Sequence, residues 1–458
     1  MLDQARTITA GPIRQVHDFK SGNEAAALAA RDIGFHVMGY FPITPSTEVA
    51  ENLSKMQANG EHDIVMIPAD GEHGAAGICY GAALGGGRVL NATSSQGLLY
   101  ALEQLPVQSG TRVPMVLNVS TRTVSGPLDI RCDHSDIYFV LNAGWIILLA
   151  RDPQAAYDMN FCAVRIGEHL DVRLPVIVAY DGFLTSHQKR RIDRFDDPEA
   201  VKAFLGERED PYTALDPDKP VTFGPYMNDP DLINNKVQQH QAMEAARRVI
   251  PEVFAEFAEF SGRDYRTVDA YRMDDADVAL VLLNSAAENA KEVADRLRDD
   301  GQKVGVVSPN VLRPFPTDEI RRLLKNVRAV VVGDRGDSYG AEGGNLSLEV
   351  RAALQQDPDN KTLVMSRVYG LGGKDFYDAD AEAFFREALT AAETGKVEVP
   401  FEYHGAYAGD DAAGPPPGLP PISKEEVSRG MATVTPNADT NKLEVELKPL
   451  WEMTTTPS

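Results

Sequence analysis

Cysteine is scarce in this sequence. Its 458 residues include three cysteines, Cys79, Cys132 and Cys162, and no two of them follow a CxxC or metal-ribbon spacing. Because iron-sulfur clusters are held by runs of four closely spaced thiolates, we do not expect this chain to hold such a cluster by itself. We expect three reduced and mostly buried thiols instead.

Long apolar runs and an excess of positive charge are also lacking. The longest apolar run, Trp145 to Ala150, is far shorter than the roughly 18 residues that can span a bilayer, and the first residues show no apolar export signal. With 45 basic and 68 acidic residues the net charge is −23, which opposes binding to nucleic acid or to an anionic membrane surface. The composition predicts a cytoplasmic, globular protein without a nucleic-acid or membrane partner.

Several motifs for cofactors and metals are absent. The sequence contains neither a GxxxxGKS/T phosphate loop nor a GxGxxG dinucleotide turn. It also lacks a Gly-Asp-Gly followed downstream by paired asparagines, the pattern with which thiamine enzymes bind magnesium diphosphate; residues 333–337 resemble it only superficially. The segment DHSD at 133–136 has no second His or Glu at ligand spacing, so we predict no metal site in this chain.

The sequence does contain two stretches in which β-branched runs alternate with amphipathic or alanine-rich segments, a pattern typical of βα units around a parallel sheet. The fold class is therefore α/β, with a doubly wound parallel-sheet domain at residues 1–193 and a second, smaller α/β domain at 273–395. The strands expected in the first domain are 35–41, 63–67, 88–92, 114–119, 145–149 and 174–180, with helices at 46–56 and 154–170. In the second domain we expect strands at 278–283, 303–307, 329–332 and 363–366, and helices at 286–299, 317–324 and 346–354.

The remaining residues show weaker patterns. Residues 194–272 are polar, contain several prolines and are partly helical near 238–260, so we interpret them as a connecting segment rather than as part of a core. Residues 396–458 contain a proline run that favours an extended course. We interpret them as an extended C-terminal arm that is either disordered or lies on a neighbouring subunit, because 443–451 alternates apolar and charged residues.

Polar side chains directly follow three of the predicted strands, where open α/β sheets place their ligands. Thr44 precedes Pro45, which suits the first position of a helix, so the Thr44 hydroxyl could cap that helix or face a ligand. Glu72 stands in the first turn of a predicted helix, where a carboxylate stabilises the helix dipole. That helix also carries several glycines, which indicates the close approach of a neighbouring helix or a ligand.

Arg122 follows the apolar strand at 114–119. An arginine at a strand end is usually solvated or ion-paired, but its planar guanidinium also suits a substrate carboxylate held by two contacts. Ser94-Ser95-Gln96-Gly97 follows another strand. We interpret it as a turn and assign it no catalytic role.

Taken together, several segments of the first domain resemble the α subunit of pyruvate and related 2-oxoacid:ferredoxin oxidoreductases. They are PITPSTE at Pro42, GEHGAAG at Gly71, ATSSQGLLYALEQL from Ala92, VSTR at Val119 and GPLDIRCDHSDIYFVLNAGW from Gly126. In the second domain the resemblance continues with VLRPFP at Val311, VGDR at Val332 and YGLGGKD at Tyr369. The resemblance implies a thiamine-pyrimidine-binding domain followed by a domain similar to the C-terminal domain of transketolase.

The resemblance also implies roles for the three polar residues. Glu72 matches the glutamate that hydrogen-bonds N1′ of the thiamine aminopyrimidine and so takes part in acid-base catalysis. Thr44 and Arg122 match residues that bind the 2-oxoacid beside the reactive carbon, Thr44 also lying against the cofactor. Arg122 would neutralise the substrate carboxylate and orient the carbonyl group.

The implied activity is the reversible oxidative decarboxylation of pyruvate to acetyl-CoA and CO₂ with reduction of ferredoxin or flavodoxin. Thiamine diphosphate would be shared with a β subunit that brings Mg²⁺ and a 4Fe-4S cluster, while γ and ferredoxin-like δ subunits complete a dimerised hetero-oligomer that uses coenzyme A as a substrate. Arg131 stands where pyruvate-type members commonly have an aromatic residue, so 2-oxoglutarate, a branched-chain or an aryl 2-oxoacid is an alternative substrate. A transketolase-like subunit without redox chemistry and a non-catalytic scaffold subunit are further alternatives.

Overall fold

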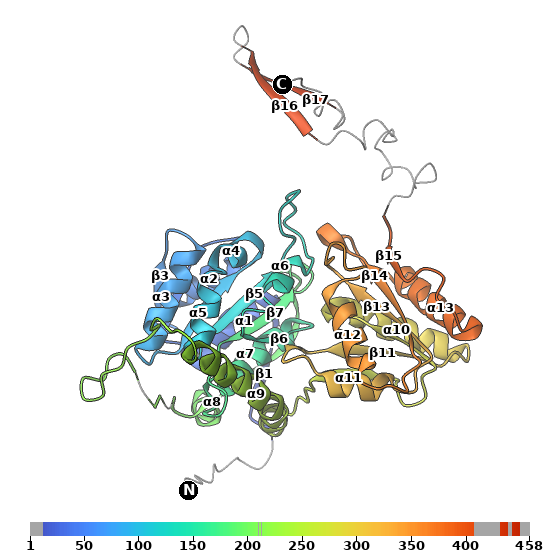
Figure 1. Ribbon diagram of the computed structural model, residues 1–458. Coiled ribbons are helices and arrows are strands. Elements are labelled where there is room, and N and C mark those ends of the chain that lie inside the picture. Colours follow the sequence, from blue (N-terminus) through green and yellow to red (C-terminus); the bar gives the residue numbers. More distant parts are fainter. Residues whose placement is uncertain (1–11, 209, 212, 407–430, 438–441, 449–458) are drawn as a thin grey trace. The chain divides into compact units, whose positions relative to one another are not determined.

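The structure is a computed structural model that describes residues 12–208, 210–211, 213–406, 431–437 and 442–448 (Figure 1). The chain divides into one unit up to His404 and a second unit from Gly405 onward. The first unit contains two mainly parallel sheets that are covered by helices, and the second contains a two-stranded hairpin. None of the described helices combines the length and the apolar character needed to cross a membrane.

A seven-stranded sheet forms the centre of the first domain. Its strands lie in the order β12 (Val311–Arg313), β6 (Ile146–Leu149), β7 (Val176–Asp181), β5 (Val116–Thr121), β4 (Val89–Thr93), β2 (Val37–Tyr40) and β3 (Val65–Pro68). The six strands expected in this domain are all present and pair in parallel, so their carboxyl ends share one edge of the sheet. The seventh, β12, comes from the second half of the chain and pairs antiparallel with β6.

Both faces of this sheet are covered by helices. The apolar side chains of one helical layer share a core cluster with the sheet; that layer is made of α1 (Gly22–Ile33), α2 (Thr47–Ala58) and α7 (Pro153–Glu168). The second layer packs against the opposite face and is made of α3 (Glu72–Leu84), α4 (Ser95–Ala101), α5 (Gln104–Gly110) and α6 (Ser135–Phe139).

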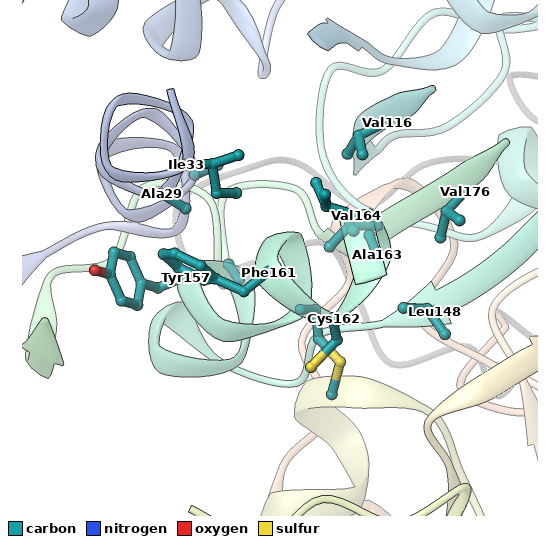
Figure 2. Close-up of a cluster of buried hydrophobic side chains, with 14 of the residues drawn as sticks. Ala29, Ile33, Val116, Leu148, Tyr157, Phe161, Cys162, Ala163, Val164 and Val176 are labelled. Atoms are coloured by element: carbon teal, nitrogen blue, oxygen red, sulfur yellow. The ribbon is translucent and has the colours of Figure 1, made fainter. Parts of the chain in front are cut away.

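The contact between α1 and α7 shows how local sequence builds this core. Figure 2 shows Ala29 and Ile33 of α1 beside Tyr157 and Phe161 of α7. Cys162 is fully buried in the same cluster, and the other two cysteines are also buried and free. The three thiols are therefore reduced and buried, as expected from the sequence.

The second domain has a smaller sheet of six strands. They lie in the order β15 (Phe401–Tyr403), β14 (Leu363–Val368), β13 (Ala329–Asp334), β10 (Val278–Val281), β11 (Val304–Pro309) and β9 (Val268–Tyr271), with only β9 antiparallel to its neighbour. Two helices cover each face: α10 (Asn284–Asp299) and α13 (Asp378–Thr394) on one, α11 (Thr317–Leu324) and α12 (Asn345–Gln355) on the other. A short 3-10 helix, η1, spans Leu371–Gly373.

The segment 194–272 contributes to the core, which contradicts its interpretation as a mere connection. It contains the last two residues of β8 (Arg190–Phe195), which pairs with β1 (Gln15–Lys20), and then α8 (Pro198–Leu205) and α9 (Asp231–Ser261). The apolar side of α9 packs into the core of the first domain. Just beyond it, Arg263 donates hydrogen bonds to the buried Asp158 of α7. The boundaries at 193, 272 and 395 remain predictions.

Residues 396–458 contain structure that the sequence did not indicate. Residues 401–403 form β15, an edge strand of the second sheet. The second unit contains the antiparallel pair β16 (Met431–Asn437) and β17 (Lys442–Lys448). The proline run at 415–421 and residues 449–451 lie outside the described residues, so the extended arm remains a prediction.

Candidate active site at the carboxyl edge of the first sheet

The carboxyl ends of four neighbouring parallel strands place the candidate site residues along one edge. Thr44 follows β2, Glu72 is the first residue of α3 after β3, Gln96 lies in the first turn of α4 after β4, and Arg122 directly follows β5. This is the arrangement that the strand-end positions predicted. Hydrogen bonds bring three of the four into one cluster, with Arg122 at its centre.

Glu72 is a buried carboxylate at the start of α3. It is 7% exposed, and within the described residues its carboxylate accepts no hydrogen bond. Its Oε1 lies 2.5 Å from the point where a side chain at position 97 would begin, so a larger residue at Gly97 would displace the Glu72 carboxylate. The buried hydroxyls of Thr93 and Ser94 also have no partner among the described residues. Because a buried polar group without a partner is costly, this part of the edge suits the polar ring of a ligand.

The guanidinium of Arg122 is anchored at one end and loosely held at the other. Its Nη1 donates to the Thr44 carbonyl at 2.8 Å, while Nη2 reaches Gln96 Oε1 and Nε reaches the Asp129 carbonyl only at 3.4 Å each. The Nε and Nη2 atoms form the edge of a guanidinium that grips a carboxylate by two parallel hydrogen bonds. This edge is therefore available for a substrate carboxylate.

Arg122 is 7% exposed, and its burial lowers the pKa of the guanidinium. The negative charges of Asp136, Asp129 and Glu72 oppose that shift. Glu72 and Arg122 are thus within electrostatic reach of each other. A carboxylate and a cation at one buried edge can bind a ligand that carries a basic nitrogen near Glu72 and an anion near Arg122.

Thr44 lies at the edge, but not as a helix cap. α2 begins at Thr47 with Ser46 before it, so the prediction that Pro45 starts the helix was wrong, as was the capping role considered for the Thr44 hydroxyl. The reason is a turn, closed by a hydrogen bond from Ser46 N to the Ile43 carbonyl at 2.9 Å, that separates Thr44 from the helix. Thr44 instead offers its carbonyl to Arg122, and its side chain is exposed at the edge.

The segment 94–97 is more than the turn that we predicted. Ser95 begins α4 with a left-handed backbone (φ 48°), and its hydroxyl donates to the Thr123 carbonyl at 2.6 Å. Gln96 contacts both Ser95 Oγ and Arg122. The available sequence signal was its position, since Gln96 follows a strand as Thr44, Glu72 and Arg122 do.

Asp136 is a site residue that the sequence interpretation missed. It is fully buried, and its Oδ2 accepts hydrogen bonds from the backbone N–H of Ser95 at 2.8 Å and of Arg122 at 2.9 Å. One carboxylate thereby joins the chain segments that follow β4 and β5. It fixes the backbone of Ser95, which precedes Gln96, and the backbone of Arg122. Asp136 acts through other residues and is a positioning residue.

Three potential metal ligands meet beside the site. Ligand atoms of Cys132, His134 and Asp181 lie within 4.8 Å of one another, so His134 of the DHSD segment meets one residue before that segment and one residue of β7. His134 Nε2 is already hydrogen-bonded to Asp181 at 2.9 Å, and burial raises the pKa of the Cys132 thiol. The cationic Arg335 also interacts with Cys132. These features disfavour a cation, and the absence of a metal site stays a prediction.

The glycines of α3 only partly meet the expectation of a close neighbour. A side chain at Gly74 would meet Asp70 Oδ1 at 2.5 Å. At Gly77 and Gly81, by contrast, no atom of the described residues would lie within 4 Å. Contacts among the described residues therefore do not explain Gly77 and Gly81.

Asp136 predicts a pH dependence of catalysis. Burial raises the pKa of Asp136 to about 7, the negative charge of Asp133 adds to this shift, and the N–H groups of Ser95 and Arg122 oppose it. Protonation of Oδ2 weakens the two hydrogen bonds, so we expect kcat/KM of the assembled enzyme to rise as pH increases through about 7. In Asp136→Asn we expect kcat/KM to fall about tenfold, the effect of losing one charged hydrogen bond, and this part of the pH profile to disappear.

A second variant separates positioning from a general loss of stability. Asp133→Asn removes a negative charge that raises the pKa of Asp136, so the rise in activity should move to lower pH. The free energy of unfolding should change with pH in the opposite direction to activity. The raised pKa of Asp136 stabilises the folded state at low pH, and this contribution is lost as pH rises through about 7. The free energy of unfolding in urea should thus decrease less between pH 5 and pH 8 in Asp136→Asn than in the wild type. An unshifted activity profile in Asp133→Asn would contradict the proposed role.

Comparisons with known proteins agree with this geometry. Residues 28–255 match the family model described as pyruvate flavodoxin/ferredoxin oxidoreductase, thiamine diphosphate-binding, and residues 276–381 match that of pyruvate:ferredoxin oxidoreductase core domain II. Pyruvate synthase subunit PorA of Thermotoga maritima is 41% identical over 369 residues, which cover 81% of this chain and 93% of that protein. The chain belongs to the pyruvate flavodoxin/ferredoxin oxidoreductase family.

Two more members extend the comparison. Ketoisovalerate oxidoreductase subunit VorA of Pyrococcus horikoshii is 33% identical over 394 residues, covering 86% of this chain and 98% of that protein. The solved 2-oxoglutarate:ferredoxin oxidoreductase from Magnetococcus marinus, with 2-oxoglutarate, coenzyme A and succinyl-CoA bound, matches 82% of this chain at a TM-score of 0.62 and 20% identity, and this chain spans 65% of its length. That likeness supports the fold alone. The resemblance and the α/β fold class expected from the sequence are both confirmed.

Proposed function

We propose that this chain is the α subunit of a pyruvate:ferredoxin oxidoreductase and supplies one half of a thiamine diphosphate site. The observation that carries the proposal is the Glu72 carboxylate, which is buried at the strand edge and accepts no hydrogen bond from the described residues. A ring nitrogen that carries a proton fits this carboxylate, and family membership points to the thiamine aminopyrimidine as its source. Glu72 and Thr44 are the residues that would hold that ring.

When bound, thiamine diphosphate supplies a nucleophilic carbon and an electron sink for decarboxylation. Glu72, which is 7% exposed, would share a proton between its carboxylate and the ring nitrogen of the bound group. The Nε and Nη2 edge of Arg122 binds the substrate carboxylate, while Nη1 stays anchored on the Thr44 carbonyl. Arg122 thereby fixes the orientation of the reacting carbonyl group.

The rest of the enzyme comes from other subunits. Three buried cysteines cannot hold a cluster of four thiolates, and the sequence lacks the magnesium diphosphate pattern. A β subunit therefore brings Mg²⁺, the diphosphate contacts and a 4Fe-4S cluster, and γ and ferredoxin-like δ subunits complete a dimerised, cytoplasmic hetero-oligomer. Electrons pass to ferredoxin or flavodoxin, and coenzyme A accepts the acetyl group.

Pyruvate is the proposed substrate because the pyruvate synthase subunit is more similar to this chain, at 41% identity, than the ketoisovalerate oxidoreductase subunit, at 33%. A branched-chain 2-oxoacid is the second candidate, because the ketoisovalerate oxidoreductase subunit is 33% identical over 86% of this chain. Arg131 is exposed and pairs with Asp129, whose carbonyl contacts Arg122. This loop is the place where we expect substrates to be distinguished.

The test is to isolate the complex that forms on a tagged copy of this chain. We expect co-purifying subunits that contain iron and acid-labile sulfide, and thiamine-dependent, coenzyme A-dependent reduction of ferredoxin with pyruvate. Relative kcat/KM for pyruvate, 2-oxoisovalerate, 2-oxoglutarate and phenylpyruvate should favour pyruvate by at least about tenfold, the effect of a methylene group or more in a pocket. A complex without iron would favour the transketolase-like alternative, and an inactive complex the scaffold alternative.

A further inference from the structure

The two domains of the first unit enclose a polar cavity that the proposed reaction does not use. It has a volume of about 500 Å³, within the range of about 300 to 1,000 Å³ that is typical of small-molecule sites. The first domain contributes Gln188 and Arg190, and the second contributes Ser285, Glu292 and Arg335 among others. None of the candidate active-site residues lines it.

Arg335 is the decisive group of this cavity. It directly follows β13, is 1% exposed and lines the cavity. Its Nε and Nη1 atoms are buried and have no hydrogen-bond partner among the described residues; its guanidinium carbon lies 5.4 Å from the centre of the Tyr369 ring. A buried guanidinium with unpaired N–H groups is a strong donor to an oxyanion.

The carboxylate of Asp181 does not meet this need. Asp181 is fully buried and interacts with the Arg335 charge. Its two oxygens, however, accept from His134 Nε2 at 2.9 Å, from Asn284 Nδ2 at 3.0 Å and from the backbone and hydroxyl of Ser285. Asp181 is therefore committed to joining the two domains, and the unpaired N–H groups of Arg335 remain for a ligand.

The charges around the cavity define the kind of ligand. Four basic side chains and four acidic ones line it, so their formal charges cancel. Lys291 is paired with Glu288 at 2.6 Å, whereas Arg190 is exposed and forms no ion pair with another described residue. The acidic side chains of Glu292, Asp295 and Asp375 also line the cavity, and Asp295 is paired with Arg272 at 3.1 Å. A polyanion would be repelled by these carboxylates, but a ligand with one anionic head and a neutral or cationic body would not.

We propose that this cavity binds a small amphoteric metabolite whose phosphate or carboxylate head pairs with Arg335 and Arg190. The body of the ligand faces the acidic wall, where an ammonium or hydroxyl group pairs with the carboxylates. Because residues of both domains line the cavity, the ligand would bridge them. The proposal does not depend on the proposed function.

The test is calorimetric titration of the purified full-length chain at constant ionic strength. Phosphoethanolamine serves as the amphoteric probe, with inorganic phosphate and ATP for comparison. We expect phosphoethanolamine to bind with a Kd of about 1 mM or tighter, phosphate more weakly and ATP more weakly still. Arg335→Met should abolish binding, and Arg190→Glu should weaken it at least about tenfold.

Arg191→Glu is the matched control. Arg191 is the next residue of β8, is exposed and contacts His17 instead of the cavity, so it should bind phosphoethanolamine as the wild type does. Should Arg335→Met fail to fold, the comparison of phosphoethanolamine binding by Arg190→Glu and Arg191→Glu tests the proposal by itself. The proposal is overturned if phosphoethanolamine does not bind up to about 10 mM, or if the Arg190 and Arg191 variants bind it equally. It is also overturned if folded Arg335→Met still binds phosphoethanolamine, which would mean an adventitious ion only. Tighter binding of ATP than of phosphoethanolamine would overturn it as well.

Discussion

Replacing Glu72 with glutamine should lower turnover of the assembled enzyme by about 100- to 10,000-fold, the range associated with loss of a general acid-base group. The amide keeps the size and polarity of the side chain but cannot share a proton with a ring nitrogen as a carboxylate does. The measurement is the exchange of labelled CO₂ into the carboxyl group of pyruvate, which reports the thiamine-dependent steps without requiring electron transfer to ferredoxin.

Two controls make this result specific to the proton. Glu51→Gln changes an exposed glutamate of α2 in the same way and should leave exchange within about twofold of the wild type. Thermal unfolding of Glu72→Gln should occur at the same temperature as the wild type or higher, because the substitution removes a buried carboxylate without a protein donor. Near-normal exchange in Glu72→Gln would rule out the proton role.

The strands and the edge that they form could be predicted from the sequence because these signals are local. The run Val116–Thr121 contains three β-branched residues, and it is buried throughout. Once the strands are parallel, the residues that follow them meet at one edge, which is why the sequence alone places Thr44 and Arg122 at the same edge. Glu72 at a helix start follows from the same logic.

Pairing between strands that lie far apart in the sequence was harder to predict. The strand Val311–Arg313 joins the first sheet although about 160 residues separate it from its partner β6, and no local pattern encodes that distance. α9 is a different case, because Ala242, Ala246, Val249 and Val253 are buried at helical spacing. The apolar spacing of α9 is present in the sequence, but the surrounding prolines and polar residues outweighed it in our interpretation.

Asp136 shows why part of the site could not be predicted. Its neighbours in the sequence made it look like one of several metal-ligand candidates, whereas its function comes from two backbone N–H groups, those of Ser95 and Arg122. A backbone donor leaves no trace in residue type. The link from Asp136 to the catalytic edge therefore exists only in three dimensions.

Replacing Arg122 with methionine should lower kcat/KM for pyruvate by at least about 100-fold, or about 2.8 kcal/mol at 1.4 kcal/mol per tenfold. Two charged hydrogen bonds to the substrate carboxylate are lost, each of which contributes about 1.5 to 3 kcal/mol. Arg122→Lys should recover only part of the loss, since an ammonium group keeps the charge but not the two-point geometry. Steady-state reduction of ferredoxin by the assembled enzyme gives kcat and KM for each variant.

A substrate without the carboxylate charge tests the contact itself. Methyl pyruvate cannot form the ion pair, so the wild type should strongly prefer pyruvate to it, and in Arg122→Met this preference should shrink by about the same factor as kcat/KM for pyruvate falls. Arg266→Met removes an exposed arginine whose side chain pairs, within the described part of the chain, with Asp264 alone; this variant should keep the wild-type preference. If Arg122→Met lowers activity with both substrates equally, Arg122 stabilises the edge through its 2.8 Å hydrogen bond to the Thr44 carbonyl instead of binding the substrate. The ratio of the two substrates therefore separates substrate binding from structural support at the residue where the two roles meet.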